Sequence, residues 1–157
     1  MVLWVYGKDG AIEVISTRGR YALRMMADLA VHQGNGFVAL KDIAGRQDIS
    51  KKYLEQIIPV LNRSGLLQTA RGYQGGYRLV KAPKDYTVRE ILLATEGSMA
   101  PVACLEGKTN SCPRCAECET LPVWKGLEKA IDEYLSGITL QDVIDGKRAD
   151  AGNNYSI

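Results

Sequence analysis

Histidine is almost absent from this chain of 157 residues, since His32 is its only example. No pair of a nucleophile and a neighbouring base can be named, so the sequence argues against a hydrolytic enzyme, and we expect no enzyme. No apolar run reaches about 18 residues, and we expect no membrane span. The first residues lack the basic start, long apolar stretch and small-residue cleavage site of a signal peptide, so we expect a cytoplasmic protein.

Cysteine is missing from the whole chain except one short stretch, where four occur as Cys104-x7-Cys112-x2-Cys115-x2-Cys118. The cytosol keeps thiols reduced, and in the run CPRCAEC the neighbours are too close for most disulfide pairings. Thiolates are preferred ligands of iron–sulfur clusters and of zinc. The spacing therefore predicts a metal centre, and structural disulfides are the alternative.

The net charge of +2 hides a division along the chain. Residues 1–89 carry 14 Lys and Arg against 7 Asp and Glu, whereas residues 90–157 carry 6 against 11. A basic half is the electrostatic footprint of a surface that binds a polyanion. The acidic half argues against DNA contact there.

Helical periodicity begins at Thr17 and predicts a first helix that ends at the glycines of residues 34–36. A short second helix is expected around residues 40–44. A third begins after Ser50, which is a typical N-cap residue. Pro59 lies inside this third helix, but the apolar stripe continues past it, so we predict a bend there and not an end.

Two strands, residues 66–70 and 77–80, are expected on either side of a glycine-rich turn, Arg71-Gly-Tyr-Gln-Gly-Gly76. A short helix, a longer helix and a glycine-tipped hairpin, in this order, are typical of a winged helix-turn-helix. The fold class is then mainly α with a small β wing (α+β). The longer helix would enter the major groove, and the wing would reach the backbone or the minor groove. A packed α+β domain with a solvated basic edge is the alternative.

After the wing, Thr87-Val-Arg-Glu90 has the pattern of a capping box and predicts a fourth helix. Residues 98–119, which hold the cysteines, show no periodicity and are expected to form a loop. A long helix should begin with Pro122 in its first turn. A short last helix, capped by Thr139, should follow it.

The long helix is the candidate dimerisation element. Its apolar residues recur at alternating steps of three and four, at Trp124, Leu127, Ile131 and Tyr134. A winged module reads few base pairs, so such proteins usually bind paired half-sites as two-fold dimers. Packing of the helix against its own domain is the alternative.

The chain divides by prediction into five parts. Residues 15–97 form the winged helix-turn-helix DNA-binding domain, residues 98–119 a cysteine-rich sensor loop, and residues 120–146 a dimerisation helix with a short capping helix. Residues 1–14 are an N-terminal extension to which we assign no role, and residues 147–157 are a polar tail.

Three separated motifs resemble those of one group of bacterial winged-helix regulators, the Rrf-two family. They are Ile15-Ser-Thr-Arg-Gly-Arg-Tyr-Ala22, Tyr53-Leu-Glu-Gln56 and Arg71-Gly-x-x-Gly-Gly-Tyr77, and the resemblance runs from about Ile15 to Gly146. The family includes iron–sulfur (IscR-type), nitric-oxide-sensing (NsrR-type) and cysteine-metabolism (CymR-type) regulators. The resemblance implies a homodimer, with a long helix crossing to the other subunit, that binds double-stranded DNA at a palindromic operator as a repressor or another regulator.

The resemblance also gives roles to individual side chains. Tyr53 and Glu55 would lie on the recognition helix, where a carboxylate can accept from cytosine N4 or repel wrong sequences. Arg71 would reach the minor groove from the wing, because a narrow minor groove attracts arginine. Lys51 and Lys52 would contact phosphates. The full set of expected DNA-binding residues is Ser50, Lys51, Lys52, Tyr53, Glu55, Gln56, Arg71 and Arg78.

The cysteines depart from the family's two-iron pattern, in which three cysteines at six-residue steps are followed three residues later by a histidine ligand. Cys112 and Cys118 keep that step. Glu106 stands where the first cysteine is expected, and Leu121 stands where the histidine is expected. The fourth ligand is therefore open.

Two metal arrangements follow from these four thiols. In one, all four bind a 2Fe-2S or 4Fe-4S cluster, with Cys115 or Cys104 in place of the histidine. In the other, Cys104, Cys112 and Cys118 bind a four-iron cluster together with an outside ligand. Zinc is the rival metal, because four cysteinates satisfy tetrahedral zinc.

The sequence thus predicts a homodimeric transcription regulator whose operator binding depends on a metal or redox state of the loop. A regulator of cysteine or sulfur metabolism, controlled by a partner protein and with structural zinc or idle cysteines, is the alternative. A ferredoxin-like electron carrier is more remote, because a carrier needs no basic, glycine-tipped hairpin.

Overall fold

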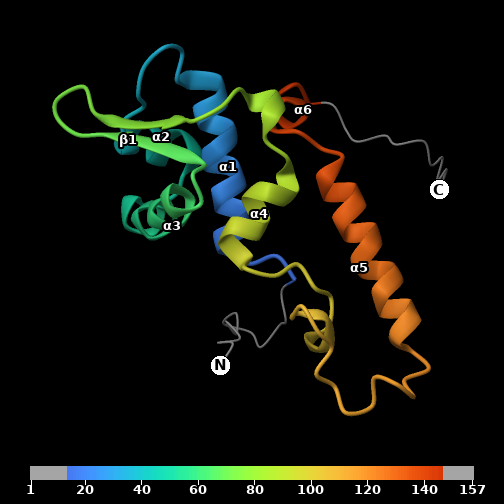
Figure 1. Ribbon diagram of the computed structural model, residues 1–157. Helices are drawn as coiled ribbons and strands as arrows, with labels where there is room; N and C mark the ends of the chain where they lie inside the picture. The colour runs from blue at the N-terminus through green and yellow to red at the C-terminus, as the bar shows by residue number, and fades with distance from the viewer. Residues whose placement is uncertain (1–13, 147–157) are drawn as a thin grey trace.

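The computed structural model describes residues 14–146, so the expectations for residues 1–13 and for the tail 147–157 lie outside the described part. The elements are α1 (Thr17–His32), α2 (Leu40–Gln47), α3 (Lys51–Arg63), β1 (Leu67–Ala70), β2 (Gly76–Leu79), the 3-10 turn η1 (Pro83–Asp85), α4 (Val88–Glu96), the 3-10 turn η2 (Ala103–Leu105), α5 (Leu121–Ser136) and α6 (Leu140–Ile144). This order confirms the predicted mainly α fold with a small β wing. Figure 1 shows α1, α4 and α6 grouped together, the hairpin and α3 on one side, and α5 leading away on the other.

The two strands pair antiparallel, with Leu67 opposite Leu79 and Ala70 opposite Gly76. Each strand lies within one residue of its predicted position. Val38, just before α2, also bridges to Tyr77 through two backbone hydrogen bonds of 2.9 Å. The hairpin is therefore attached to the segment before α2 near the turn end of β2, and the turn itself extends beyond (Figure 1).

The main core surrounds the apolar stripe of α1, on which apolar residues of α3, the hairpin, α4 and α6 converge. Met25 and Met26 are fully buried, so both methionines fill the core as the spacing indicates. α3 continues through Pro59 to Arg63, which confirms that the proline does not end the helix. The stripe on the inner side of α3 consists of Leu54, Ile57, Ile58 and Leu61.

The predicted capping box at Thr87 is only half formed. The Thr87 hydroxyl accepts a hydrogen bond from the Glu90 N–H at 3.0 Å, as an N-cap should. The Glu90 carboxylate, however, accepts from Lys81 Nζ at 2.8 Å, because an ammonium group within reach is a stronger partner than a backbone N–H. A complete box occurs instead at the start of α6, between Thr139 and Asp142.

A second apolar cluster joins α4 to the far end of α5. Val88 and Leu92 of α4 are buried against Leu135, and Ile131 packs on the same cluster. Arg89 and Asp132 form an ion pair between the two helices. Contact with α4 therefore lies toward the C-terminal end of α5, and its N-terminal end leads away from the domain (Figure 1).

Among residues 14–146, no helix is both long and apolar enough to cross a membrane.

Candidate nucleic-acid interface and cysteine loop

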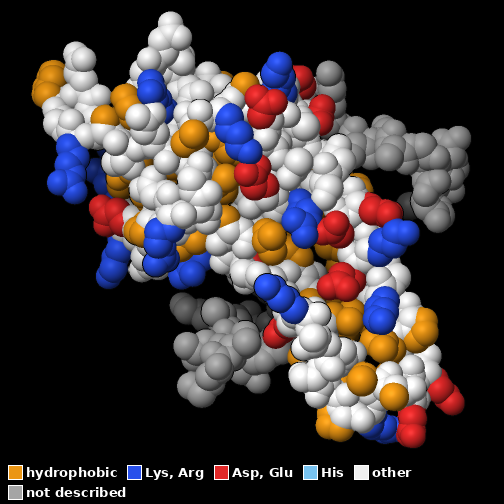
Figure 2. Space-filling view, in the orientation of Figure 1, with side chains coloured by type: hydrophobic (Ala, Val, Ile, Leu, Met, Phe, Trp, Pro, Cys, Tyr) orange, Lys and Arg blue, Asp and Glu red, His pale blue; other side chains and the backbone are white. Residues whose placement is uncertain are grey.

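The outer side of α3 is polar and open to solvent. Lys51, Lys52, Glu55 and Gln56 are exposed, whereas the apolar stripe of the same helix is buried. This division follows from the helical spacing, because residues three and four apart share one side. In Figure 2, Lys and Arg side chains gather around α3 and the wing with few acidic neighbours, whereas both signs mix near α4 and α5. The structure thus brings the four predicted side chains of α3 together on a basic surface.

Two predicted DNA-binding residues also have structural partners. The Ser50 hydroxyl accepts the Tyr53 N–H at 3.2 Å and caps α3. The Tyr53 ring is half-buried and meets Tyr21 of α1 edge-on, with 5.2 Å between ring centroids. Tyr53 therefore helps to hold α3 on α1, and this contact limits how far the Tyr53 ring can reach outward.

A buried carboxylate orders the junction of α1 and α2. Asp28 is 3% exposed and accepts hydrogen bonds from Arg46 at 2.7 and 3.0 Å and from Gln47 at 3.0 Å. Burial by itself would raise the pKa of Asp28, but these hydrogen bonds, with the Arg46 and His32 charges, hold its pKa below the ordinary value. Arg24 also donates to Gln47. The ionised carboxylate thus fixes the helix that precedes α3.

The wing (β1, β2 and residues 71–75 between them) carries the other two predicted residues. Arg71 is exposed, and no hydrogen bond or ion pair involves it within the described part of the chain. Arg78 is half-buried, donates to Gln68 Oε1 at 2.8 Å, and lies over the Phe37 ring at 4.6 Å. Arg71 is therefore free to reach a ligand, whereas the Arg78 guanidinium already contacts Gln68 and the Phe37 ring.

The cysteine loop (residues 98–119) joins α4 to α5 through turns, and η2 is the helical element within it. All four cysteines are free thiols and half-buried. Among the described residues, no three His, Cys, Asp or Glu side chains gather closely enough to hold a metal ion. The structure thus places the predicted ligands in one loop but does not converge them on one point.

Two polar groups in the cysteine loop bear on its chemistry. A hydrogen bond between Cys118 and the Thr120 hydroxyl, at 3.4 Å, lowers the pKa of Cys118 and favours the thiolate. Asn110 accepts the Cys112 N–H at 2.9 Å through its side-chain oxygen. Its amide nitrogen Nδ2 is buried without a hydrogen-bond partner. A buried N–H of this kind usually marks a missing acceptor.

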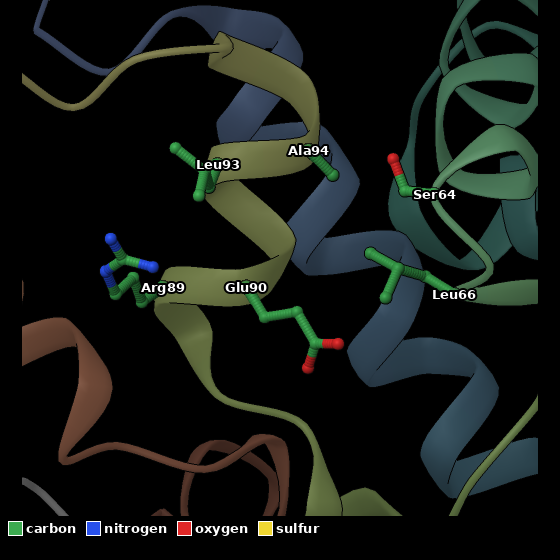
Figure 3. Close-up of a pocket in the computed structure, with 6 residues that line it drawn as sticks. All are labelled: Ser64, Leu66, Arg89, Glu90, Leu93 and Ala94. Carbon is green, nitrogen blue, oxygen red and sulfur yellow. The ribbon is translucent and has the colours of Figure 1, made fainter. Parts of the chain in front are cut away.

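A hollow of about 270 Å³ lies between the end of α3 and α4 (Figure 3). Its lining residues are Ser64, Leu66, Arg89, Glu90, Leu93 and Ala94. Glu90 pairs with Lys81 and Arg89 with Asp132, so partners outside the hollow hold both of its charged groups. The hollow therefore offers an apolar floor but little to bind a polar substrate.

The predicted apolar seam of α5 splits into two sides. Ile131 packs on the α4 cluster, and Trp124 is half-buried. Leu127 and Tyr134 are 44% and 57% exposed, and Val123 lies on their side of the helix at 62%. Packing on the chain's own domain thus accounts for part of the seam, and the exposed side remains the candidate dimer surface.

Sequence reasoning missed three residues around these sites. Tyr21 of α1 contacts Tyr53 of α3, and Arg24, one turn further along α1, lies over the Tyr21 ring and donates to Gln47 of α2. The three-residue spacing of Tyr21 and Arg24, which puts them on one side of the helix, was the signal in the sequence. Tyr73 at the turn of the wing is fully exposed. No local pattern marks a turn residue of this kind, because its exposure depends on how the folded hairpin presents it.

Known proteins match nearly the whole described chain. The sequence profile of the Rrf2 family, described as an iron-dependent transcriptional regulator, matches residues 15–146. Protein rrf2 of Nitratidesulfovibrio vulgaris is 41% identical over 130 residues, covering 83% of this chain and 86% of that protein. The HTH-type transcriptional regulator IscR of Erwinia tasmaniensis is 35% identical over 147 residues, covering 91% and 88% respectively.

Solved structures give the same result. CymR, the global cysteine regulator of B. subtilis, aligns with a TM-score of 0.69 at 34% identity, covering 85% of this chain and 98% of that one. T. potens IscR aligns with a TM-score of 0.67 at 38% identity, covering 95% and 98%. IscR of Erwinia tasmaniensis and CymR of B. subtilis are named as regulators and not as enzymes. The chain is a DNA-binding transcriptional regulator and belongs to the Rrf2 family, as its motifs predicted.

Proposed function

We propose that the protein acts as a homodimer whose operator binding is set by an iron–sulfur cluster, or by another metal or redox state, of the cysteine loop. The observation that carries this proposal is the position of the thiols. Four free cysteines lie in the segment that joins α4, part of the DNA-binding domain, to the partly exposed helix α5. A change in this loop therefore acts on the link between the DNA-reading unit and its candidate dimer surface.

The chemistry of the donor set fits a soft metal centre. Reduced thiols suit iron–sulfur clusters and zinc, and the lowered pKa of Cys118 favours the ligating form. The unpartnered Asn110 Nδ2 supplies a buried N–H donor within two residues of Cys112, of the kind that often hydrogen-bonds to metal-bound sulfur. A bound cluster would supply a group whose charge and persistence respond to oxidants and to iron supply.

The separation of the thiols links metal binding to a movement of the cysteine loop. Because no three described ligand side chains gather, metal loading must draw the cysteine loop together. The loop follows closely on α4, which ends at Glu96, and leads into α5, which begins at Leu121. The Arg89–Asp132 pair and the Ile131 contacts hold α5 to α4 and resist its displacement. Loading is then expected to change how α5 lies against α4, and thereby the spacing of two DNA-reading units in a dimer.

In the DNA complex, α3 presents its polar side to the major groove. Lys51 and Lys52 would neutralise phosphates near its start, Ser50 would contact the backbone, and Glu55 and Gln56 would face base edges. Arg71 would enter the minor groove from the wing. Tyr53 and Arg78 would act mainly by holding these groups in place, because each is engaged with protein partners.

Anaerobic purification tests the cofactor directly. A brown protein with iron and acid-labile sulfide, and with different DNA affinity or sequence preference in its loaded and metal-free forms, is the expected result. The probe is a duplex enriched from a random library by the loaded protein. A colourless protein that contains zinc would show that the metal is zinc and not an iron–sulfur cluster. Equal DNA binding by the loaded and metal-free forms would contradict the sensor function.

A second candidate is a regulator of cysteine or sulfur metabolism controlled by a partner protein. The separated thiols favour it, since the described cysteine loop has no three-ligand group. The similarity to a structure described as a global cysteine regulator points the same way. This candidate predicts a protein without iron or sulfide whose DNA affinity stays unchanged when all four cysteines are replaced by serine.

A further inference from the structure

Tyr73 lies at the turn of the wing with its side chain wholly in solvent. The residue is 104% exposed, whereas no other exposed large apolar residue of the described chain exceeds 62%. An aromatic ring carries a large apolar area, which usually finds a partner in a protein or its complexes. Single exposed apolar residues are common, so exposure alone does not assign a role. The geometry of the turn and its charge supply the argument.

The turn that carries Tyr73 is tightly constrained. The Gly75 N–H donates to Gly72 O at 3.0 Å across the turn. A Cβ on Gly75 would overlap the Ala70 carbonyl oxygen, and Gly72 has φ +103°, a value that side chains rarely adopt. Such a turn cannot easily fold Tyr73 back onto the protein. The backbone that carries Tyr73 is therefore constrained, and the ring points into solvent.

The surroundings of this ring are basic. Arg71, two residues before it, is exposed and has no protein partner among the described residues. Lys and Arg side chains with few acidic neighbours mark this side of the molecule in Figure 2. A surface of this charge fits a polyanion better than the same surface of a second copy, which would bring like charges together.

We propose that Tyr73 is a DNA-contacting residue of the wing. Its ring lies against the deoxyribose at the edge of the minor groove that Arg71 enters, and its hydroxyl donates to a phosphate oxygen. Tyrosine hydroxyls are among the donors used for phosphates in protein–DNA complexes, and the ring face is complementary to the apolar side of the sugar. Tyr73 then sets how deeply and in which register Arg71 enters the groove.

The test compares Tyr73→Phe, Tyr73→Ala and Arg71→Ala on one probe, a duplex enriched from a random-sequence library by the unaltered protein. Loss of the hydroxyl should weaken binding about threefold to tenfold, the effect of one net hydrogen bond. Loss of the ring as well should weaken it about tenfold to fiftyfold. Tyr73 is neutral, so both variants should keep the salt dependence of the unaltered protein, whereas Arg71→Ala should flatten it.

Hydroxyl-radical footprinting reports how accessible each deoxyribose is. A merely structural role of Tyr73 would not change the protection at individual sugars. Tyr73→Ala should lose protection at the wing's sites and keep it where α3 binds. Gln74→Ala, the exposed neighbour, is the matched control and should bind as the unaltered protein does. Thermal unfolding should be unchanged in Tyr73→Ala, since the side chain has no protein contact to lose.

The proposal is overturned if Tyr73→Ala keeps both affinity and footprint while Arg71→Ala loses them. This result would show that the wing contacts DNA through Arg71 and not through Tyr73. Unchanged binding by both variants would also overturn it and would remove the wing from the interface. A changed oligomeric state of Tyr73→Ala in light scattering, with an intact footprint, would assign the ring to a protein contact instead.

Discussion

Glu96 accepts two hydrogen bonds from Ser16, from its backbone N–H at 3.1 Å and from its hydroxyl at 2.8 Å. The Ser16 hydroxyl in turn accepts the Gly19 N–H at 3.3 Å and caps α1. Glu96 is also the last residue of α4, immediately before the chain turns toward the cysteine loop. The first helix of the DNA-binding domain is thus tied to the point where the candidate sensor segment begins.

Gly19 makes this tie possible and gives the first prediction. A Cβ at Gly19 would overlap Glu96 Oε1 and come within 3.3 Å of Leu92 Cδ2. Replacing a helical glycine by alanine normally stabilises a protein by about 1 kcal/mol. Here the clash must displace the carboxylate, so we expect Gly19→Ala to lower the free energy of unfolding by about 1–3 kcal/mol, measured in urea.

Gly45 of α2 provides the matched control, since a Cβ there meets nothing within 4 Å. Gly45→Ala should raise the free energy of unfolding by about 0.5–1 kcal/mol. In the double variant with Glu96→Ala, the obstacle to a Cβ at Gly19 is removed, and the added cost of Gly19→Ala should largely disappear. A stabilising effect of Gly19→Ala on its own would show that the tie does not form.

The buried carboxylate of Asp28 predicts a dependence on pH. Its pKa is lowered in the folded protein, so the unfolded chain binds more protons in the acidic range. The stabilisation is fully present above the unfolded pKa of about 3.9 and is lost as the pH falls through the lower, folded value. Asp28→Asn should therefore cost about 2–3 kcal/mol near neutral pH and progressively less in acid.

Urea unfolding of both proteins across this range measures the difference. Asp42→Asn, an exposed carboxylate on α2, is the control and should change stability by no more than about 0.5 kcal/mol. A difference between Asp28→Asn and the unaltered protein that stays constant from neutral pH into acid would contradict the assigned ionisation.

The lysines at the start of α3 predict a steep salt dependence of DNA binding. Lys51 and Lys52 are exposed at the start of α3, and Lys and Arg side chains gather around this helix in Figure 2. Each phosphate contact contributes about −0.9 to the slope of log affinity against log salt. Lys51→Gln should lower affinity and flatten the slope by about that amount per lost contact, whereas Lys125→Gln on α5 should leave both unchanged. An unaltered slope of log affinity against log salt for Lys51→Gln would show that Lys51 does not contact a phosphate.

Local patterns predicted the elements well because their causes are local. The apolar stripe of α3 and the Ser50 cap are set by residues within one or two turns, and both appear as expected. The Thr87 box could not be predicted in full, because Lys81, from outside the helix, takes the Glu90 carboxylate. A competing partner from another segment leaves no trace in a four-residue pattern.

The candidate site divides in the same way. The α3 side chains follow from helical spacing, but the split of the α5 seam depends on which of its sides α4 covers. The sequence spacing also predicted that the four cysteines lie in one loop. Spacing does not predict the conformation of a loop that lacks periodicity. Their separation in the described chain is therefore a result that only the structure supplies.

The exposed side of α5 predicts a test of dimerisation. Leu127 is 44% exposed in the single chain, so Leu127→Lys should change the stability of the protomer by no more than about 0.5 kcal/mol. In an apolar dimer interface, the same unpaired charge costs about 3–5 kcal/mol and should give a monomer at low micromolar concentration. Light scattering measures this. Lys125→Glu, on the opposite side of the helix by spacing, should remain dimeric.

The cysteines predict a graded response to serine substitution. Both ligand arrangements use Cys112 and Cys118, so Cys112→Ser and Cys118→Ser should abolish metal loading, because serine is a poorer, harder ligand than thiolate. Cys115→Ser separates the arrangements. Full loss of iron and sulfide supports four thiolates, and full retention supports three cysteines with an outside ligand. Metal and sulfide contents after anaerobic purification give the readout.

Ser111→Ala, beside Cys112 and exposed, is the control for disturbance of the loop and should load metal normally. Loading must gather thiols that lie apart in the described chain, so each variant that fails to load should also bind DNA as the metal-free protein does. That pairing of effects distinguishes a sensor from an incidental metal site. If Cys112→Ser loses its metal but binds DNA as the loaded protein does, the metal is structural and the regulator responds to another signal.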